Sequence, residues 1–210
     1  MYVCPSNVNF INTMIIMKKI IYLVLLSLIT GLVAQAYEKT GEWNGCDRYD
    51  FTFKDRQATI VVPKKAAKGN PWIWRPAFFD AFPSVDKALL EKGFHIVYYD
   101  VTHLYGSPRA VSLGTEFYEN MTDLYNLSEK VTLEGFSRGG LFVFNWAAQN
   151  TEKVACIYVD APVCDVFSWP GRKNTALWND LLKEWNLTDA GMEHFKGNPI
   201  DNLAPIAAAG

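Results

Sequence analysis

Hydrophobic and polar positions change their period along the chain, and these changes predict strands that alternate with helices. Residues 48–63 alternate and turn at residues 54–56, which predicts an antiparallel hairpin. Apolar runs typical of strands covered on both faces follow at residues 71–75, 94–101, 130–136 and 154–163. Helical patterns occupy residues 82–93, with Ser84 as the expected N-cap, 108–128 and 139–150. This order predicts an α/β fold, a mainly parallel sheet with helices on both faces and the hairpin at one edge.

The pattern changes after Val163, where a loop precedes residues 175–185, which carry leucines and tryptophans at helical spacing. We expect residues 37–163 to form the core and residues 164–210 to form a cap or insertion segment over the carboxyl edge of the sheet. The tryptophans of this segment are interpreted first as helix core, with stacking on sugars as the alternative.

The N-terminal segment has the three parts of a secretory signal peptide. Lysines at 18 and 19, an apolar stretch at 20–33 and an A-x-A site ending at Ala36 follow one another. We therefore expect residues 1–36 to be a leader, with the signal peptide at 17–36 and translation starting at Met17. The apolar stretch is short for a transmembrane helix. The mature protein is expected to be secreted or periplasmic, without membrane attachment after cleavage.

Composition and charge narrow the classes of function. With 210 residues, 50% of them apolar, the chain can bury the core of one domain. The net charge of −2, with no basic patch, argues against a nucleic-acid partner. Cys156 is expected to be buried in its strand, and a disulfide among Cys46, Cys156 and Cys164 is left open. No Cys/His cluster has zinc spacing, so we expect no metal and no cofactor.

The segment Gly135-Phe136-Ser137-Arg138-Gly139 is a G-x-S-x-G motif between a predicted strand and a predicted helix. A serine at such a turn projects its hydroxyl from the backbone, and small flanking residues let strand and helix pack closely around it. We expect Ser137 to be a nucleophile, with the oxyanion held by the N–H groups of Arg138 and Ala77, Phe78 being the alternative to Ala77. Arg75, at the mouth of the same loop, is expected to bind a carboxylate of the substrate.

The acid and the base that would activate Ser137 are less well defined. Asp160 ends the next strand and is the candidate acid. Asp160 or Asp165 followed by His194 satisfies the chain order serine, acid, histidine. His103, just beyond the end of a predicted strand, is the second candidate base.

Four segments carry a resemblance to a known family: "WIWRPAFF", "DVTHLYGSP", "LEGFSRGG" and "DAPVCDVFSWPG". They resemble the α/β-hydrolase superfamily and, within it, exported bacterial carbohydrate esterases that remove methyl or acetyl esters from pectin-type polysaccharides. The resemblance implies Ser137 as nucleophile, the Arg138 N–H in the oxyanion hole and Arg75 near the substrate. It also implies an acid and a histidine on later strands, so we expect the core to be truncated before its last strands, beyond Gly210.

Three hypotheses about function follow. The first is a secreted serine esterase that acts through an acyl-enzyme on Ser137 on an ester-bearing polysaccharide or oligosaccharide. The second is a serine peptidase of the same fold. The third is a vestigial, non-catalytic sugar-binding remnant of a hydrolase. The sequence predicts no particular oligomeric state.

Overall fold

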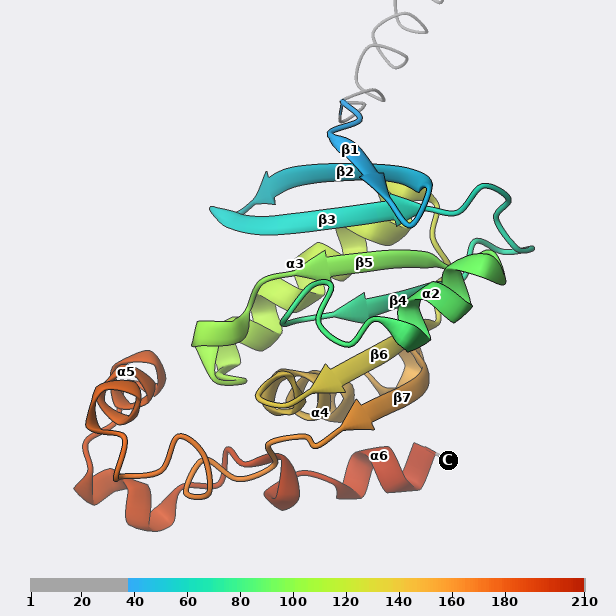
Figure 1. Ribbon diagram of the computed structural model, residues 1–210. Helices are drawn as coiled ribbons and strands as arrows, with labels where there is room; N and C mark the ends of the chain where they lie inside the picture. The colour runs from blue at the N-terminus through green and yellow to red at the C-terminus, as the bar shows by residue number, and fades with distance from the viewer. Residues whose placement is uncertain (1–37, 210) are drawn as a thin grey trace, which may run out of the picture. The chain divides into compact units, whose positions relative to one another are not determined.

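A mixed β-sheet forms the centre of the protein in the computed structural model, which describes residues 38–209. Within these residues seven strands pair in the order β1-β2-β3-β5-β4-β6-β7 (Figure 1). The strands are β1 (Gly41–Trp43), β2 (Cys46–Phe53), β3 (Arg56–Val62), β4 (Trp72–Arg75), β5 (His95–Tyr99), β6 (Val131–Phe136) and β7 (Val154–Asp160). The predicted leader lies outside the described residues, so export stays a prediction.

The antiparallel part of the sheet lies at one edge, as predicted. β1, β2 and β3 pair in antiparallel order, and β3 continues antiparallel onto β5. Lys54 and Asp55 join β2 to β3 with φ angles of +47° and +61°. Two consecutive residues with positive φ are the geometry of the tight hairpin turn that matches the twist of the two strands. β5, β4, β6 and β7 are parallel.

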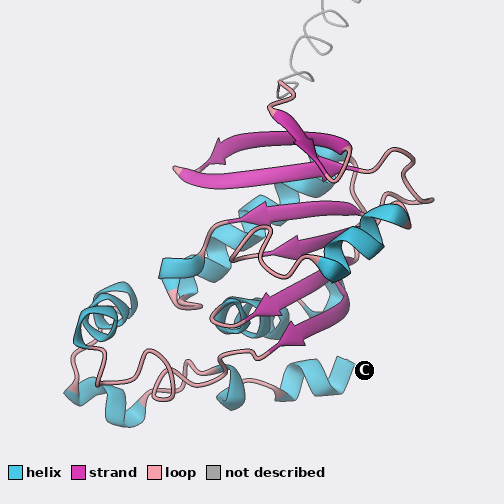
Figure 2. Ribbon diagram, viewed as in Figure 1, coloured by secondary structure: helices cyan, strands magenta, loops and turns pink. Residues whose placement is uncertain are grey.

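Helices cover both faces of the sheet (Figure 2). They are α2 (Ser84–Glu91), α3 (Pro108–Tyr125), α4 (Gly139–Gln149), α5 (Thr175–Trp185) and α6 (Ala204–Ala209), with 3-10 turns η1 (Thr102–Leu104), η2 (Thr151–Lys153), η3 (Ala190–His194) and η4 (Pro199–Asp201). Trp72 and Trp74 pack with residues of α3 and α4, whereas Ile73 between them packs with Leu90 of α2. Successive side chains of a strand point to opposite faces, so a strand covered on both faces is apolar throughout. The prediction of an α/β fold with a mainly parallel sheet is confirmed.

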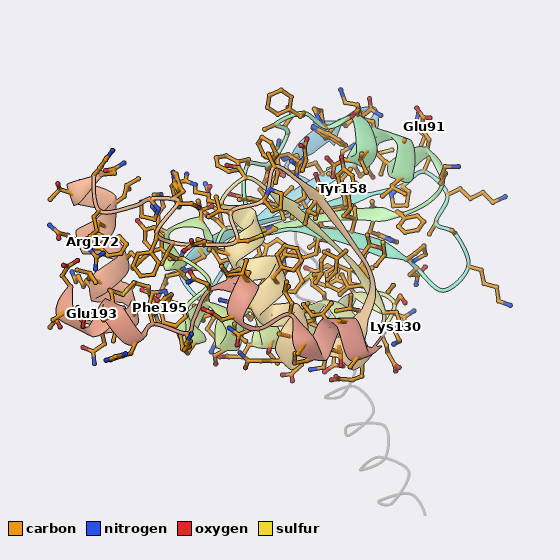
Figure 3. All side chains as sticks on the ribbon, turned by 90° about the horizontal axis from the view of Figure 1, so that it is seen from below. Glu91, Lys130, Tyr158, Arg172, Glu193 and Phe195 are labelled. Atoms are coloured by element: carbon orange, nitrogen blue, oxygen red, sulfur yellow. The ribbon has the colours of Figure 1, made fainter. Side chains whose placement is uncertain are left out.

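Two local predictions were wrong. Ser84 was expected to be the N-cap of α2 but is its first helical residue. Pro83 occupies the N-cap position, and no side chain caps the helix. Cys156 is exposed because β7 is the last strand of the described sheet and is only partly covered. Tyr158 on the same strand is 37% exposed (Figure 3). The cysteines at 46, 156 and 164 are free thiols.

The first part of the segment after β7, which includes α5, lies at the end toward which β4, β5, β6 and β7 point, whereas α6 runs back beside β7 and contacts α4 and η2 (Figure 1). Trp178 and Leu181 of α5 form a buried cluster with Tyr105, Leu141 and others. Trp178 is 4% exposed, in agreement with its interpretation as helix core. No helix among residues 38–209 combines the length and apolarity that a membrane crossing requires.

Candidate active site

Ser137 occupies the sharp turn between β6 and α4. Its φ of +51° lies in the left-handed region, which L-residues other than glycine rarely adopt. The Ser137 N–H donates to the Asp160 carbonyl at 3.0 Å, and the Ser137 carbonyl accepts from the N–H groups of Gly140 and Val163 at 3.0 and 2.8 Å. These bonds fix the unfavourable backbone from both sides. Strain of this kind clusters at functional sites, because the surrounding structure must maintain it.

Three glycines make room for the turn. A Cβ on Gly135 would meet Val159 Cγ1 at 3.0 Å, and one on Gly140 would meet Pro162 Cβ at 2.7 Å. A Cβ on Gly139 would lie 3.4 Å from Pro76 Cγ and 3.5 Å from Ala77 Cβ. The sequence prediction used Gly135 and Gly139, the two glycines of the motif, and missed Gly140, although the Gly139-Gly140 pair was a visible signal. The glycine positions bring β7 and the loop after β4 against the serine turn.

The loop after β4 supplies the second wall of the site. Ala77 is 2% exposed and lies beside Gly139, at the start of α4. Within residues 38–209 no oxygen accepts from the N–H of Ala77 or from the N–H of Arg138. Phe78, the alternative donor, has a φ of +55°. Two N–H groups without an internal acceptor, at a helix N-terminus, are the elements of an oxyanion hole. That role stays a prediction for both residues.

Arg75 is buried among internal partners, which contradicts its expected position at the mouth of the loop. It is 1% exposed, and its Nη1 donates to Asp86 Oδ2 at 2.5 Å. Its Nη2 donates to the Ala81 carbonyl at 2.9 Å and lies 3.3 Å from Glu134 Oε1. The guanidinium of this last residue of β4 therefore contacts the loop between β4 and α2, the first turn of α2, and β6. Its partners are internal, and the sequence pattern could not show this because they come from three elements.

Glu134 is a buried carboxyl group that sequence analysis did not single out. It lies on β6, three residues before the serine, and is 4% exposed. Burial and the charge of the neighbouring Asp86 raise its pKa to about 8, and the charge of Arg75 opposes this. The charge of Asp160 raises the pKa further. The carboxyl group therefore keeps its proton to a higher pH than an exposed glutamate does, and it shares the single guanidinium with Asp86.

The candidate acid and bases lie in different surroundings. Asp160 ends β7 beside the turn, where its carbonyl binds the Ser137 N–H, and its side chain is exposed. His103 is exposed in η1, and His194 is exposed at the end of η3. Within residues 38–209 no histidine hydrogen-bonds to Ser137. Glu193 and Phe195, which flank His194, lie at the opposite end of the molecule from Lys130, which precedes β6 (Figure 3).

No group of three or more His, Cys, Asp or Glu side chains in the described part of the chain is arranged to hold a metal ion. The chemistry available at the site is that of a serine on a strained turn, two N–H groups and nearby carboxylates. These features on a parallel sheet define the class of proteins that carry a nucleophile elbow. A profile of the alpha/beta hydrolase fold matches residues 69–203. The chain belongs to this α/β-hydrolase family.

Solved structures share the fold at low sequence identity. A putative dipeptidyl aminopeptidase IV from Bacteroides ovatus is 12% identical with a TM-score of 0.55, over 76% of this chain and 26% of that one. Porphyromonas gingivalis dipeptidyl peptidase 4 is 14% identical with a TM-score of 0.54, over 78% and 26%. An S-formylglutathione hydrolase from Agrobacterium tumefaciens is 13% identical with a TM-score of 0.51, over 67% and 70%. The likeness shows the fold, and this chain spans only about a quarter of each peptidase. No curated protein matches the sequence significantly.

Proposed function

We propose that the protein is a serine esterase that removes methyl or acetyl esters from a polysaccharide or oligosaccharide, with Ser137 as the nucleophile. The observation that carries the proposal is the positive φ of Ser137, held by hydrogen bonds to Asp160 and Val163. A structural serine gains nothing from this costly conformation, whereas a nucleophile gains an exposed hydroxyl. Membership of the α/β-hydrolase family supports the hydrolytic part of the proposal.

The reaction follows the general course of acyl transfer. A base takes the proton of the Ser137 hydroxyl as Oγ attacks the ester carbonyl carbon. The resulting oxyanion accepts hydrogen bonds from the N–H groups of Ala77 and Arg138. Its collapse expels the alcohol, which takes up the proton, and water then hydrolyses the acyl-enzyme to release the acid. His103 and His194 are the described histidines that we put forward as bases, with Asp160 as the acid.

The polysaccharide substrate and the export of the protein rest on sequence. The four segments that resemble carbohydrate esterases support the substrate class, and the signal-peptide pattern supports export. Export is tested by N-terminal sequencing of the mature protein from the native host. A chain that starts at Tyr37 supports it, and a chain that keeps Met17 contradicts it.

Ester hydrolysis is tested with 4-nitrophenyl acetate, methyl-esterified pectin and acetylated pectin. We expect turnover by the purified protein and a loss of about 10³-fold or more in kcat/KM for Ser137→Ala. Ser112→Ala, on the exposed side of α3, is the matched control and should keep full activity. Equal activity of Ser137→Ala and the control would contradict the proposal.

Two further comparisons separate the alternatives. Amide substrates of the same acyl groups distinguish an esterase from a peptidase, because a peptidase also cleaves the amides. His103→Ala and His194→Ala, assayed separately, identify the base, since loss of the base lowers kcat as much as loss of the serine. A fluorophosphonate probe that labels Ser137 in the wild-type protein shows an activated hydroxyl. No labelling and no turnover together would favour the non-catalytic hypothesis.

A further inference from the structure

The side chain of Arg138, next to the serine, lies between two aromatic rings from separate segments. Its guanidinium carbon is 4.9 Å from the centre of the Phe78 ring and 5.7 Å from that of Trp169. Phe78 belongs to the loop after β4, and Trp169 to the segment after β7. Two rings around a guanidinium hold its plane through cation–π attraction and leave its N–H edge for hydrogen bonds.

The N–H edge of Arg138 has no internal acceptor. The six arginines of the chain all lie in the described region. Five of them donate to an oxygen of the protein: Arg48, Arg56, Arg75, Arg109 and Arg172. No oxygen among residues 38–209 accepts from Arg138, and its Nε is buried. A buried donor on a charged group without an acceptor costs free energy, which an anionic ligand would offset.

Arg172 shows the same arrangement with the acceptor present. Its guanidinium lies 5.5 Å from the Phe167 ring and 5.3 Å from the Trp178 ring. Its Nε donates to Asp189 Oδ1 at 3.0 Å. Both guanidiniums lie near two rings, and the described residues supply a carboxylate to Arg172 but none to Arg138.

A second donor without a partner, the hydroxyl of Tyr105, belongs to a ring that lies near Trp169. Tyr105 is 1% exposed, and its ring centre lies 6.1 Å from that of Trp169. Within the described residues its hydroxyl has no hydrogen-bond partner. Burial raises the pKa of Tyr105, the Asp180 charge adds to the rise and the Arg138 charge opposes it.

We propose that Arg138, between Phe78 and Trp169, forms a carboxylate-binding subsite beside Ser137, and that the substrate is an ester of an acidic sugar. The inference deepens the proposed function and rests on it. A carboxylate matches the planar fork of a guanidinium with two parallel hydrogen bonds. Arg138 thereby takes the substrate-binding role that the sequence suggested for Arg75.

The test measures binding of galacturonate and galactose to the Ser137→Ala protein by NMR titration. The two sugars differ in the carboxylate at C6, so the comparison isolates that group. We expect galacturonate to bind at least about tenfold more tightly than galactose, in line with the strength of hydrogen bonds to charged groups. Arg138→Met, added to the same protein, should remove this difference, because methionine keeps much of the apolar length without the charge.

Arg172→Met is the matched control, because it removes a ring-stacked arginine whose acceptor is internal. It should leave the preference for galacturonate intact. Trp169→Leu, which removes one ring, should weaken galacturonate binding in a protein that retains Arg138. Far-UV circular dichroism and thermal unfolding establish that each variant is folded.

The outcomes separate this inference from the proposed function. Equal affinities for galacturonate and galactose, or a preference that survives Arg138→Met, would overturn the subsite. Tighter binding of galactose 1-phosphate than of galacturonate would overturn the assignment to a carboxylate. Ser137-dependent ester hydrolysis without any preference for acidic sugars would leave the function standing and remove the subsite. Arg138-dependent galacturonate binding without ester hydrolysis would support the subsite and contradict the proposed function.

Discussion

The backbone N–H of Ser137 donates to the carbonyl oxygen of Asp160, the last residue of the neighbouring strand β7, at 3.0 Å. The Val163 N–H returns to the Ser137 carbonyl at 2.8 Å. The segment from Asp160 to Val163 therefore holds the serine turn through two backbone hydrogen bonds. These contacts, with a strand that is adjacent in space and distant in sequence, offset the strain at Ser137. The geometry of the nucleophile depends on how closely β7 approaches α4.

Gly140→Ala should open this contact. The added Cβ would lie 2.7 Å from Pro162 Cβ and 2.9 Å from the Val163 carbonyl oxygen, so backbone must move. We expect the free energy of unfolding in urea to fall by about 1–3 kcal/mol, as for overpacking, although alanine is the better helix former. Gly41→Ala is the control, because nothing lies within 4 Å of its added Cβ. A stability equal to that of the control would show that the segment after β7 moves freely.

Ser137→Gly and Ser137→Ala should differ in stability in an unusual direction. At a φ of +51° an L-residue pays about 1–2 kcal/mol that glycine avoids. We therefore expect the glycine variant to be the more stable of the two by about 1 kcal/mol, measured by urea unfolding. The same pair at Ser112, exposed in α3, should show the opposite order by about 1 kcal/mol. The same order at both positions would mean that the serine turn stores no strain.

Asp86→Ala should destabilise the protein strongly. Asp86 and Arg75 have side chains 1% and 2% exposed, so the substitution leaves a buried guanidinium without its main partner. We expect a loss of about 3–5 kcal/mol in the free energy of unfolding. Glu116→Ala breaks the exposed ion pair with Lys54 and should cost less than about 1 kcal/mol. Similar losses at the two positions would contradict the difference that burial makes.

The fold could be predicted from the sequence because the apolar runs of β4, β5 and β6 are buried on both faces, and because Ser137 follows such a run. The helix boundaries were harder to predict, since the N-cap of α2 is Pro83 and not Ser84. The exposure of Cys156 could not be predicted, because an apolar strand looks alike at the centre and at the edge of a sheet. Local pattern carries no information on strand order.

The candidate site was predictable only in its local part. The turn at Ser137 is built from neighbours in sequence, so the motif revealed it. The partners of Arg75 come from α2, β6 and the loop between β4 and α2, and the rings around Arg138 come from two segments that meet only in the fold. Two arginines near one site look equivalent in sequence. The structure shows that Arg75 is buried and paired within the protein, whereas Arg138 has no acceptor among residues 38–209.

Glu134→Gln should change the pH dependence of stability. Burial and the Asp86 charge raise the pKa of Glu134 from 4.5 to about 8. Between these values the folded protein holds a proton that the unfolded chain has lost, so the free energy of unfolding falls as pH rises from about 4.5 to 8. Glutamine cannot ionise and removes this loss. Relative to wild type, the variant should therefore gain at least about 1 kcal/mol between pH 5 and pH 9.

Urea unfolding of both proteins at pH 5, 7 and 9 measures this gain. Glu116→Gln is the matched control, because its side chain is 44% exposed and pairs with Lys54 at the surface. Its stability curve should run parallel to that of the wild-type protein. A Glu134→Gln curve that also runs parallel would mean that the carboxyl group ionises in the folded protein as readily as in the unfolded chain. The Arg75 guanidinium would then neutralise two carboxylates at once, and Glu134 would place a negative charge three residues before the serine.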